Sequence, residues 1–243
     1  TYFIWRNSYV QPQIRPTIAS QGCLFEGNPS FIGGQWKESP VDSFFCIDMQ
    51  NLQAKAFHDK SIAGRFGHTY SNIGGFLYVF GGKGKDEDFY NDMWKFNKGK
   101  WEQVSLPKKF EQKPEKRAYH TADVFEDNQL IIFGGLSFKK KVLNDFWIFD
   151  TNEKKWTLFN FPDAPTARFG HSSGMVGSKL VIYGGKNMKD VFDDCYVFDF
   201  GTWMWSKIAL KDSHLEPRYG HRSFVYDSCI VFIGGTPDDK NGS

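Results

Sequence analysis

Four histidines recur at an almost constant interval, and histidine is a common metal ligand. They are His68, His120, His171 and His221, separated by 52, 51 and 50 residues. A regular fold would place them at equal heights around an axis, but equivalent atoms of packed sheets lie about 10 Å apart. Zinc holds its ligands at about 2.0–2.1 Å. We therefore expect a structural role, such as hydrogen bonding between repeated units, and no metal or cofactor.

An arginine stands three residues before each of these histidines. The four are Arg65, Arg117, Arg168 and Arg218. A guanidinium group is a planar, bidentate donor that fits carboxylates and phosphates. Exposed in a ring, the four would bind an acidic or phosphorylated segment of a partner protein; buried, they would bond loop carbonyl groups. The sequence leaves both roles open, and we take these arginines as the candidate partner-binding residues.

No motif typical of an enzyme stands in a fitting context, whether a Gly-x-Ser-x-Gly pattern, a Walker loop or a carboxylate pair. The cysteines Cys23, Cys46, Cys195 and Cys229 match neither CxxC nor zinc-ribbon spacing. The last three lie within apolar runs, as buried free thiols do. We expect a protein without catalytic activity. Its cysteines are expected to be free thiols, as in a reducing compartment, and a Cys23–Cys46 disulfide is the alternative.

Charge is nearly balanced, with 30 Lys and Arg against 28 Asp and Glu. A nucleic-acid or membrane-surface binder shows a concentrated basic stripe instead. No apolar run approaches the length of a membrane-spanning helix. The chain begins at Thr1 without a targeting segment, and we expect a piece of a longer cytoplasmic protein that binds neither nucleic acid nor membrane.

Five Gly-Gly doublets reveal a repeat of about 50 residues. They begin at Gly33, Gly81, Gly134, Gly184 and Gly234, at steps of 48, 53, 50 and 50 residues. The apolar runs before the last four are rich in β-branched and aromatic residues, which predicts strands buried on both faces. The doublets provide positive φ angles and allow a close approach of neighbouring groups.

Two further features keep the same phase. An acidic and aromatic strand follows three doublets, over 91–96, 144–149 and 193–198, and a tryptophan then opens a last strand. We expect these tryptophans, Trp101, Trp156 and Trp205, in the core. The residues Asn91, Asp92, Asn144, Asp145, Asp193 and Asp194 are expected to cap the loops before the third strands. Four short strands per unit are the content of one propeller blade, and the double glycine, the aromatic strand and the tryptophan together resemble the kelch repeat family along essentially the whole chain.

The resemblance implies an all-β, kelch-type β-propeller with four full four-stranded blades and partial blades at both ends, within a ring of six or seven blades. Residues 1–10 are expected to form an orphan last strand, residues 218–235 a partial blade, and the full blades 15–62, 65–106, 117–161 and 168–210. In the first blade Phe57 takes the place of the tryptophan, with Ile62 five residues on. An alternative is that the orphan strand completes the last blade.

A kelch propeller implies non-catalytic binding of other proteins. We expect a scaffold subunit of a multi-protein cytoplasmic assembly, cytoskeletal or ciliary in kind. It would bind its partner through an acidic peptide segment of that partner. The alternatives are the substrate-recognition propeller of a ubiquitin-ligase adaptor and a regulatory propeller attached to an enzyme domain such as a phosphatase. The loops 83–91, 107–116 and 136–143 offer a second contact surface; within them Lys139–Lys141 forms either a solvated tip or a contact to an acidic partner or RNA.

Overall fold

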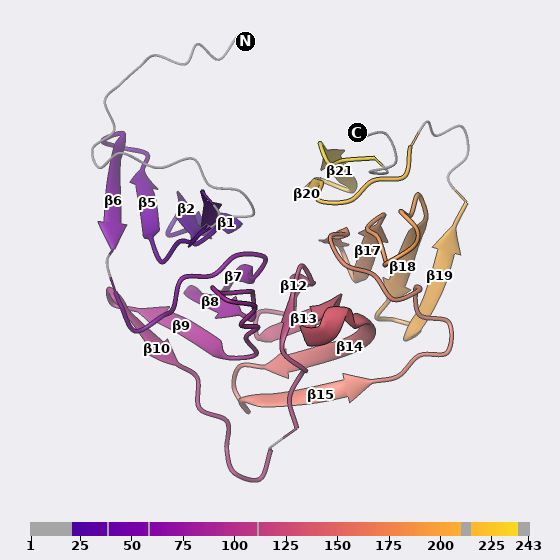
Figure 1. Ribbon diagram of the computed structural model, residues 1–243, viewed down its shortest axis with the longest axis horizontal. Coiled ribbons are helices and arrows are strands. Elements are labelled where there is room, and N and C mark those ends of the chain that lie inside the picture. Colours follow the sequence, from indigo (N-terminus) through magenta and orange to yellow (C-terminus); the bar gives the residue numbers. More distant parts are fainter. Residues whose placement is uncertain (1–20, 38, 58, 111, 210–214, 238–243) are drawn as a thin grey trace.

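The strands form successive antiparallel sheets arranged around a common centre, as Figure 1 shows for the computed structural model. It describes residues 21–37, 39–57, 59–110, 112–209 and 215–237. Within these residues the one helical element is a single 3-10 turn, η1 (Phe138–Lys140), and no helix is long or apolar enough to cross a membrane. The predicted all-β propeller is confirmed; the expected orphan strand at 1–10 lies outside the described residues.

Four sheets have four strands or more and are called blades 1 to 4. Blade 1 contains β1 (Gln21–Phe25), β2 (Asn28–Ile32), β5 (Phe44–Asp48) and β6 (Gln53–Phe57), with a small hairpin of β3 (Gln35–Trp36) and β4 (Ser39–Pro40) in its loop. Blade 2 contains β7 (Thr69–Ile73), β8 (Phe76–Phe80), β9 (Met93–Asn97) and β10 (Lys100–Gln103). In both blades each strand pairs with the next strand of the same sheet, so both are meanders.

Blade 3 contains β11 (Arg117–Ala118), β12 (Thr121–Phe125), β13 (Gln129–Ser137), β14 (Val142–Asp150) and β15 (Lys155–Phe159). Blade 4 contains β16 (Ser172–Val176), β17 (Lys179–Tyr183), β18 (Cys195–Asp199) and β19 (Met204–Ile208). A half-blade of β20 (Arg222–Tyr226) and β21 (Cys229–Ile233) follows. The innermost strands β1, β7, β12, β16 and β20 contact one another in sequence, which makes them the inner wall of the propeller.

The hydrophobic core lies between blades. One cluster joins Phe80 and Met93 of blade 2 to Trp156 and Phe149 of blade 3, and equivalent clusters join each other neighbouring pair. The expected burial of Trp101, Trp156 and Trp205 is confirmed, at 3–5% exposure. The sheets therefore depend on each other for the burial of their faces.

The expected register of the first blade was wrong at its last strand. Ala54 pairs with Ile47 at the place where Trp156 pairs with Phe149 in blade 3. The turn is the same in both blades: Asp48 accepts the amide hydrogens of Gln50 and Asn51 as Asp150 accepts those of Asn152 and Glu153, and the fourth strand starts five residues after the aspartate. Counted from this turn, the position of the tryptophan is occupied by Ala54 and not by Phe57. The small Ala54 leaves the core to be filled by Phe57, which stacks on Phe44, and by the buried Ile62.

All four cysteines are free. Burial raises the pKa of Cys23 and of Cys195 to about 11, with hydrogen bonds from Ser30 and Tyr70 opposing the shift at Cys23. Burial also raises the pKa of Cys46, whereas Cys229 is exposed on the half-blade.

Alkylation with iodoacetamide at pH 8 should therefore modify Cys229 first, Cys46 more slowly, and Cys23 and Cys195 last. A thiol with a pKa near 11 holds only about 0.1% of the reactive thiolate at that pH. Peptide mapping by mass spectrometry measures the order of modification. In denaturant the four cysteines should react at similar rates. Equal rates at Cys195 and Cys229 in the folded protein would contradict this arrangement of the thiols.

Candidate functional site

The arginines of blades 2, 3 and 4 lie inside the protein, with 0–1% exposure for Arg65, Arg117 and Arg168. In Arg117, Nη1 and Nη2 each donate at 2.6 Å to one carboxylate oxygen of Asp145. Nη1 also donates to the Gly134 carbonyl at 2.9 Å, and Nε to the Glu115 carbonyl at 3.0 Å. Arg65 forms the same set of bonds with Asp92, and Arg168 with Asp194.

The aspartates are held in turn by the arginines. Burial by itself would raise the pKa of Asp92 and Asp145, but the hydrogen bonds and charge of the paired arginine, together with the indole NH groups of Trp94 and Trp147, bring it below the ordinary value. Sequence reasoning placed these aspartates at loop caps and did not find their partners. The signal was present, because each arginine precedes its aspartate by 26 to 28 residues.

Arg218 differs because it belongs to the half-blade. It is half-buried, and donates to the carbonyl groups of Gly234 at 3.2 Å and Glu216 at 3.3 Å. The sequence left two roles open for these arginines, binding a partner and bonding groups within the fold. For Arg65, Arg117 and Arg168 the geometry favours the second, structural role. Direct contact of these four arginines with a partner stays a prediction.

The glycine doublets form the joints between blades. The amide of each second glycine donates at 2.8 Å to the carbonyl of the next blade's arginine, as Gly82 does to Arg117 and Gly135 to Arg168. At each first glycine, φ is between 62° and 65° in the full blades, and an added Cβ would lie 2.5–2.8 Å from that same carbonyl. Only glycine leaves room for this contact.

The histidines lie in the same joints. His120 Nε2 is 3.0 Å from Thr69 Oγ1 of blade 2, and His171 Nε2 is 2.9 Å from Thr121 Oγ1 of blade 3, so hydrogen bonding between units is confirmed for both. Burial lowers the pKa of all four, to about 3 for His68 and about 4 for His221. In the described part of the chain, no group of three or more His, Cys, Asp or Glu side chains is placed to hold a metal ion.

Residues 170–174 follow the Gly-x-Ser-x-Gly pattern of nucleophilic serines. In those enzymes the serine stands at a sharp turn from a strand to a helix. Here Ser172 lies in the extended strand β16, paired with Tyr183, and is buried. Its surroundings therefore differ from a nucleophile elbow.

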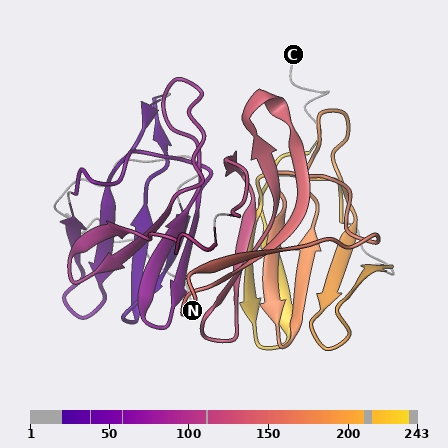
Figure 2. The ribbon, with the colours of Figure 1, turned by 90° about the horizontal axis from the view of Figure 1, so that it is seen from below.

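The loops that follow the glycine doublets of blades 2, 3 and 4, together with the loop that leads into blade 3, are called the loop face (residues 83–91, 112–116, 136–143 and 186–192). Lys141 pairs with Glu115 at 2.9 Å, and the Asn91 amide donates to the Pro114 carbonyl at 2.9 Å, so three of the four loops are joined. The loop 136–143 is largely a continuation of β13 and β14, which extend past their glycine doublet through a register shift and end in η1 (Figure 2).

The tip of this hairpin is unusual in two ways. Phe138 is 54% exposed, and Lys139 and Lys140 both have a φ of 60°, in the left-handed region that non-glycine residues seldom adopt. Strain of this kind persists only where the surrounding structure maintains it, and it gathers at functional sites. Met188 on the neighbouring loop of blade 4 is also exposed.

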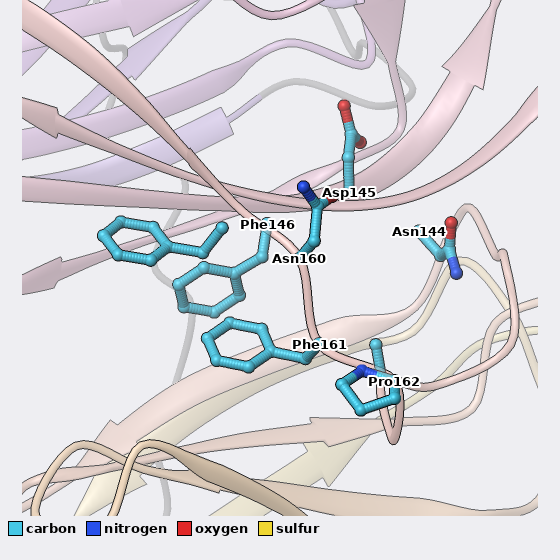
Figure 3. Close-up of a pocket in the computed structure, with 8 residues that line it drawn as sticks. Asn144, Asp145, Phe146, Asn160, Phe161 and Pro162 are labelled. Carbon is cyan, nitrogen blue, oxygen red and sulfur yellow. The ribbon is translucent and has the colours of Figure 1, made fainter.

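A pocket of about 320 Å³ opens beside the loop face, between the start of β14 and the chain that leaves β15 (Figure 3). Phe146 and Phe161 form its apolar floor, with ring centroids 5.6 Å apart, and the exposed Asn144 and Asn160 stand at its rim. Asp145 also lines the pocket but is already paired with Arg117. The side chains that line this pocket contain no arrangement of an acid, a base and a nucleophile.

Repeated four-stranded sheets, with arginine, histidine and double glycine at each joint, define a repeat β-propeller. The chain belongs to the kelch-repeat family: residues 23–238 match the family described as the KLHDC2/KLHL20/DRC7 Kelch-repeats domain. This fold is typically used to bind other proteins.

Three relatives illustrate the range of proteins that carry similar repeats. "Tip elongation aberrant protein 1" of Schizosaccharomyces pombe is 28% identical over 70% of this chain, and "Dynein alpha chain, flagellar outer arm" of Chlamydomonas reinhardtii is 28% identical over 67%. "F-box/kelch-repeat protein At1g51550" of Arabidopsis thaliana is 27% identical over 84%. The matched regions span 15%, 4% and 45% of the lengths of these relatives.

Proposed function

We propose that this chain is a non-catalytic protein-interaction module that binds an acidic segment of a partner through its loop face. The observation that carries the proposal is the β13–β14 hairpin, which extends beyond the blade and presents the exposed Phe138 beside three lysines. Packing of the blade does not require this tip. An apolar anchor surrounded by charge is a common form of an interaction surface.

The charges near the hairpin fit an acidic partner. Lys113, Lys116 and Lys139–Lys141 lie on the two loops of blade 3, against the single acid Glu115 on the described part of the same loops. In this proposal the buried arginines act as positioning residues. Each one fixes the base of a loop by binding the carbonyl of a doublet glycine and the aspartate at the start of the third strand.

The finer assignment rests on the relatives. The names of the tip elongation protein and the flagellar dynein chain support a scaffold role in a cytoplasmic assembly of cytoskeletal or ciliary kind. The F-box relative supports the second candidate, a substrate-recognition propeller of a ubiquitin-ligase adaptor. Both roles use protein binding at an exposed face, so one experiment tests the common part.

The test measures binding of a fluorescent glutamate-rich peptide to the variant Lys139→Gln/Lys140→Gln/Lys141→Gln by anisotropy. Affinity should fall about tenfold, which corresponds to about 1.4 kcal/mol, with a weaker dependence on salt. The melting temperature should stay unchanged because the tip is exposed.

The matched control is Lys98→Gln/Lys100→Gln/Lys154→Gln, which removes the same charge from exposed residues at the turns on the opposite end of the blades. This control should bind the peptide as the parent does. An equal loss in both variants would show a response to net charge alone and would contradict a loop-face site.

A further inference from the structure

A second groove, of about 420 Å³, lies at the other end of the strands, where the hairpin turns of blades 3 and 4 meet. We call it the turn-face groove. Figure 2 shows these turns on the opposite end from the β13–β14 hairpin tip. Its walls include the aromatic side chains of Phe125, Phe159, Phe200 and Trp203, and its rim carries Glu126 and Glu153.

The walls of the groove are aromatic. Phe125 of blade 3 stacks on Phe200 of blade 4, with centroids 3.9 Å apart and planes 13° from parallel. Phe159 of blade 3 contacts Trp203 of blade 4 at 5.1 Å. Phe200 is buried, but Trp203 remains 43% exposed, so part of the indole is available to another molecule.

The backbone of Trp203 makes this exposure notable. Trp203 directly precedes the fourth strand of its blade and has a φ of 56°. The same position is Leu52 in blade 1, Gly99 in blade 2 and Lys154 in blade 3, all with positive φ. Glycine adopts this conformation freely and a bulky aromatic residue does not. Neither the conformation of the turn nor burial in the core therefore explains why a tryptophan occupies this position.

The rim of the groove carries unneutralised negative charge. Glu126 and Glu153 are exposed, and neither forms an ion pair with any residue in the part of the chain that the structure describes. The one lysine of the groove, Lys155, directs its ammonium group to the ring of Phe110, 5.2 Å away. Asp150 caps its own turn by accepting the amides of Asn152 and Glu153.

We propose that the turn-face groove binds an arginine-bearing peptide segment of a partner protein. A guanidinium group is planar, stacks on an indole and donates to carboxylates at its edge. Trp203 would provide the stacking surface, and Glu126 and Glu153 would accept the donated hydrogens. The inference rests on the proposed function only in that the chain binds proteins, because its surface and the charge of its partner are the opposite of those of the loop face.

The test follows the ¹⁵N indole signal of Trp203, identified by its loss in Trp203→Phe, during titration with the peptide (Gly-Arg)₃. The Trp203 signal should shift, and the signals of the buried Trp101, Trp156 and Trp205 should not. The peptide (Gly-Glu)₃ should have no effect. In Glu126→Gln/Glu153→Gln the affinity for (Gly-Arg)₃ should fall about tenfold because the charge complementarity at the rim is lost while the stacking surface of Trp203 remains.

Two matched variants separate binding from folding. Trp203→Gly and Leu52→Gly both relieve a positive φ at the same turn position. Leu52→Gly should change the melting temperature little, whereas Trp203→Gly should lower it because the ring contacts with Phe159, Phe198 and Phe200 are lost, so binding is compared at a temperature where both variants are folded. Isothermal titration calorimetry, which does not depend on the Trp203 signal, should show that only Trp203→Gly loses (Gly-Arg)₃ binding. Undiminished binding in Trp203→Gly, equal loss in Leu52→Gly, or an equal response to (Gly-Glu)₃ would overturn the proposal.

Two further measurements keep this test independent of the loop face. The variant Lys139→Gln/Lys140→Gln/Lys141→Gln should bind (Gly-Arg)₃ as the parent does, whether or not the loop face binds an acidic peptide. If the Trp203 signal shifts with protein concentration in the absence of peptide, the groove is occupied by a second copy of the chain, and an arginine-bearing partner is rejected.

Discussion

Replacement of Arg117 by methionine is expected to lower the free energy of unfolding by about 3–5 kcal/mol, the loss typical of a buried ion pair that has lost one partner. Arg117 is fully buried and serves Asp145 through two bonds and the Gly134 and Glu115 carbonyls through one each. The variant leaves a carboxylate without its cation and a buried carbonyl group without its donor. Urea denaturation followed by circular dichroism measures the change.

The control for this prediction is Lys55→Met, which breaks an exposed ion pair with Asp48 at 3.4 Å. Its effect should lie within about 1 kcal/mol, because water screens such pairs. If Arg117→Met is no less stable than Lys55→Met, the arginines are not structural, and the expectation that they face a partner regains its support.

The dependence on pH gives a second check of the same pair. The pKa of Asp145 lies below its ordinary value because the effect of Arg117 exceeds that of burial. A carboxylate with a lowered pKa stabilises the fold above its unfolded pKa of about 3.9, and that contribution is lost as the pH falls through the folded value. The stability difference between the parent and Arg117→Met should therefore be larger at pH 7 than near pH 3.

Truncation of Trp156 to alanine should destabilise the protein by about 3–5 kcal/mol, the range for a large aromatic residue removed from a core. Its ring lies 4.9 Å from Phe80 of blade 2 and 4.9 Å from Phe149 of its own blade, so the variant leaves a cavity at the contact of two blades. Thermal melting by calorimetry measures the loss. Tyr226→Ala, at a residue that is 74% exposed, is the control and should change stability by about 0.5 kcal/mol or less. Equal melting of the two variants would show that Trp156 is not a core residue.

The sequence predicts the strands of this fold well because each blade repeats one pattern of buried residues. The glycine doublets, the arginine and histidine and the tryptophan occupy the same joint in blade after blade, so a spacing in the chain corresponds to a contact in space. The prediction failed at Ala54, where the repeat has lost its tryptophan although it keeps the aspartate-capped turn that sets the register in blade 3. Without the tryptophan, the residues of this one repeat could not be aligned with the equivalent positions of the other repeats.

The candidate sites were less predictable, for a different physical reason. Arg117 and Asp145 pair although they are 28 positions apart in the chain. Each of these charged residues, taken from the sequence alone, is as compatible with exposure to solvent as with a buried ion pair. The exposure of Phe138 at the hairpin tip depends on the extension of β13 and β14 past the doublet, which the residues 136–143 do not signal. Trp203 lies beside Phe159 only because two blades meet there.

The joint between blades also determines how blades assemble. Its donor, the second glycine, always lies on the earlier blade and its acceptor, the arginine carbonyl, always on the later one. Such a contact is heterologous in the sense used for subunits: it repeats a rotation, and it ends only when the accumulated rotation closes on itself. The chemistry of the joint is the same at every step, so it carries no information on the number of blades. That number follows from the angle between neighbouring sheets, which the aromatic side chains packed between them determine.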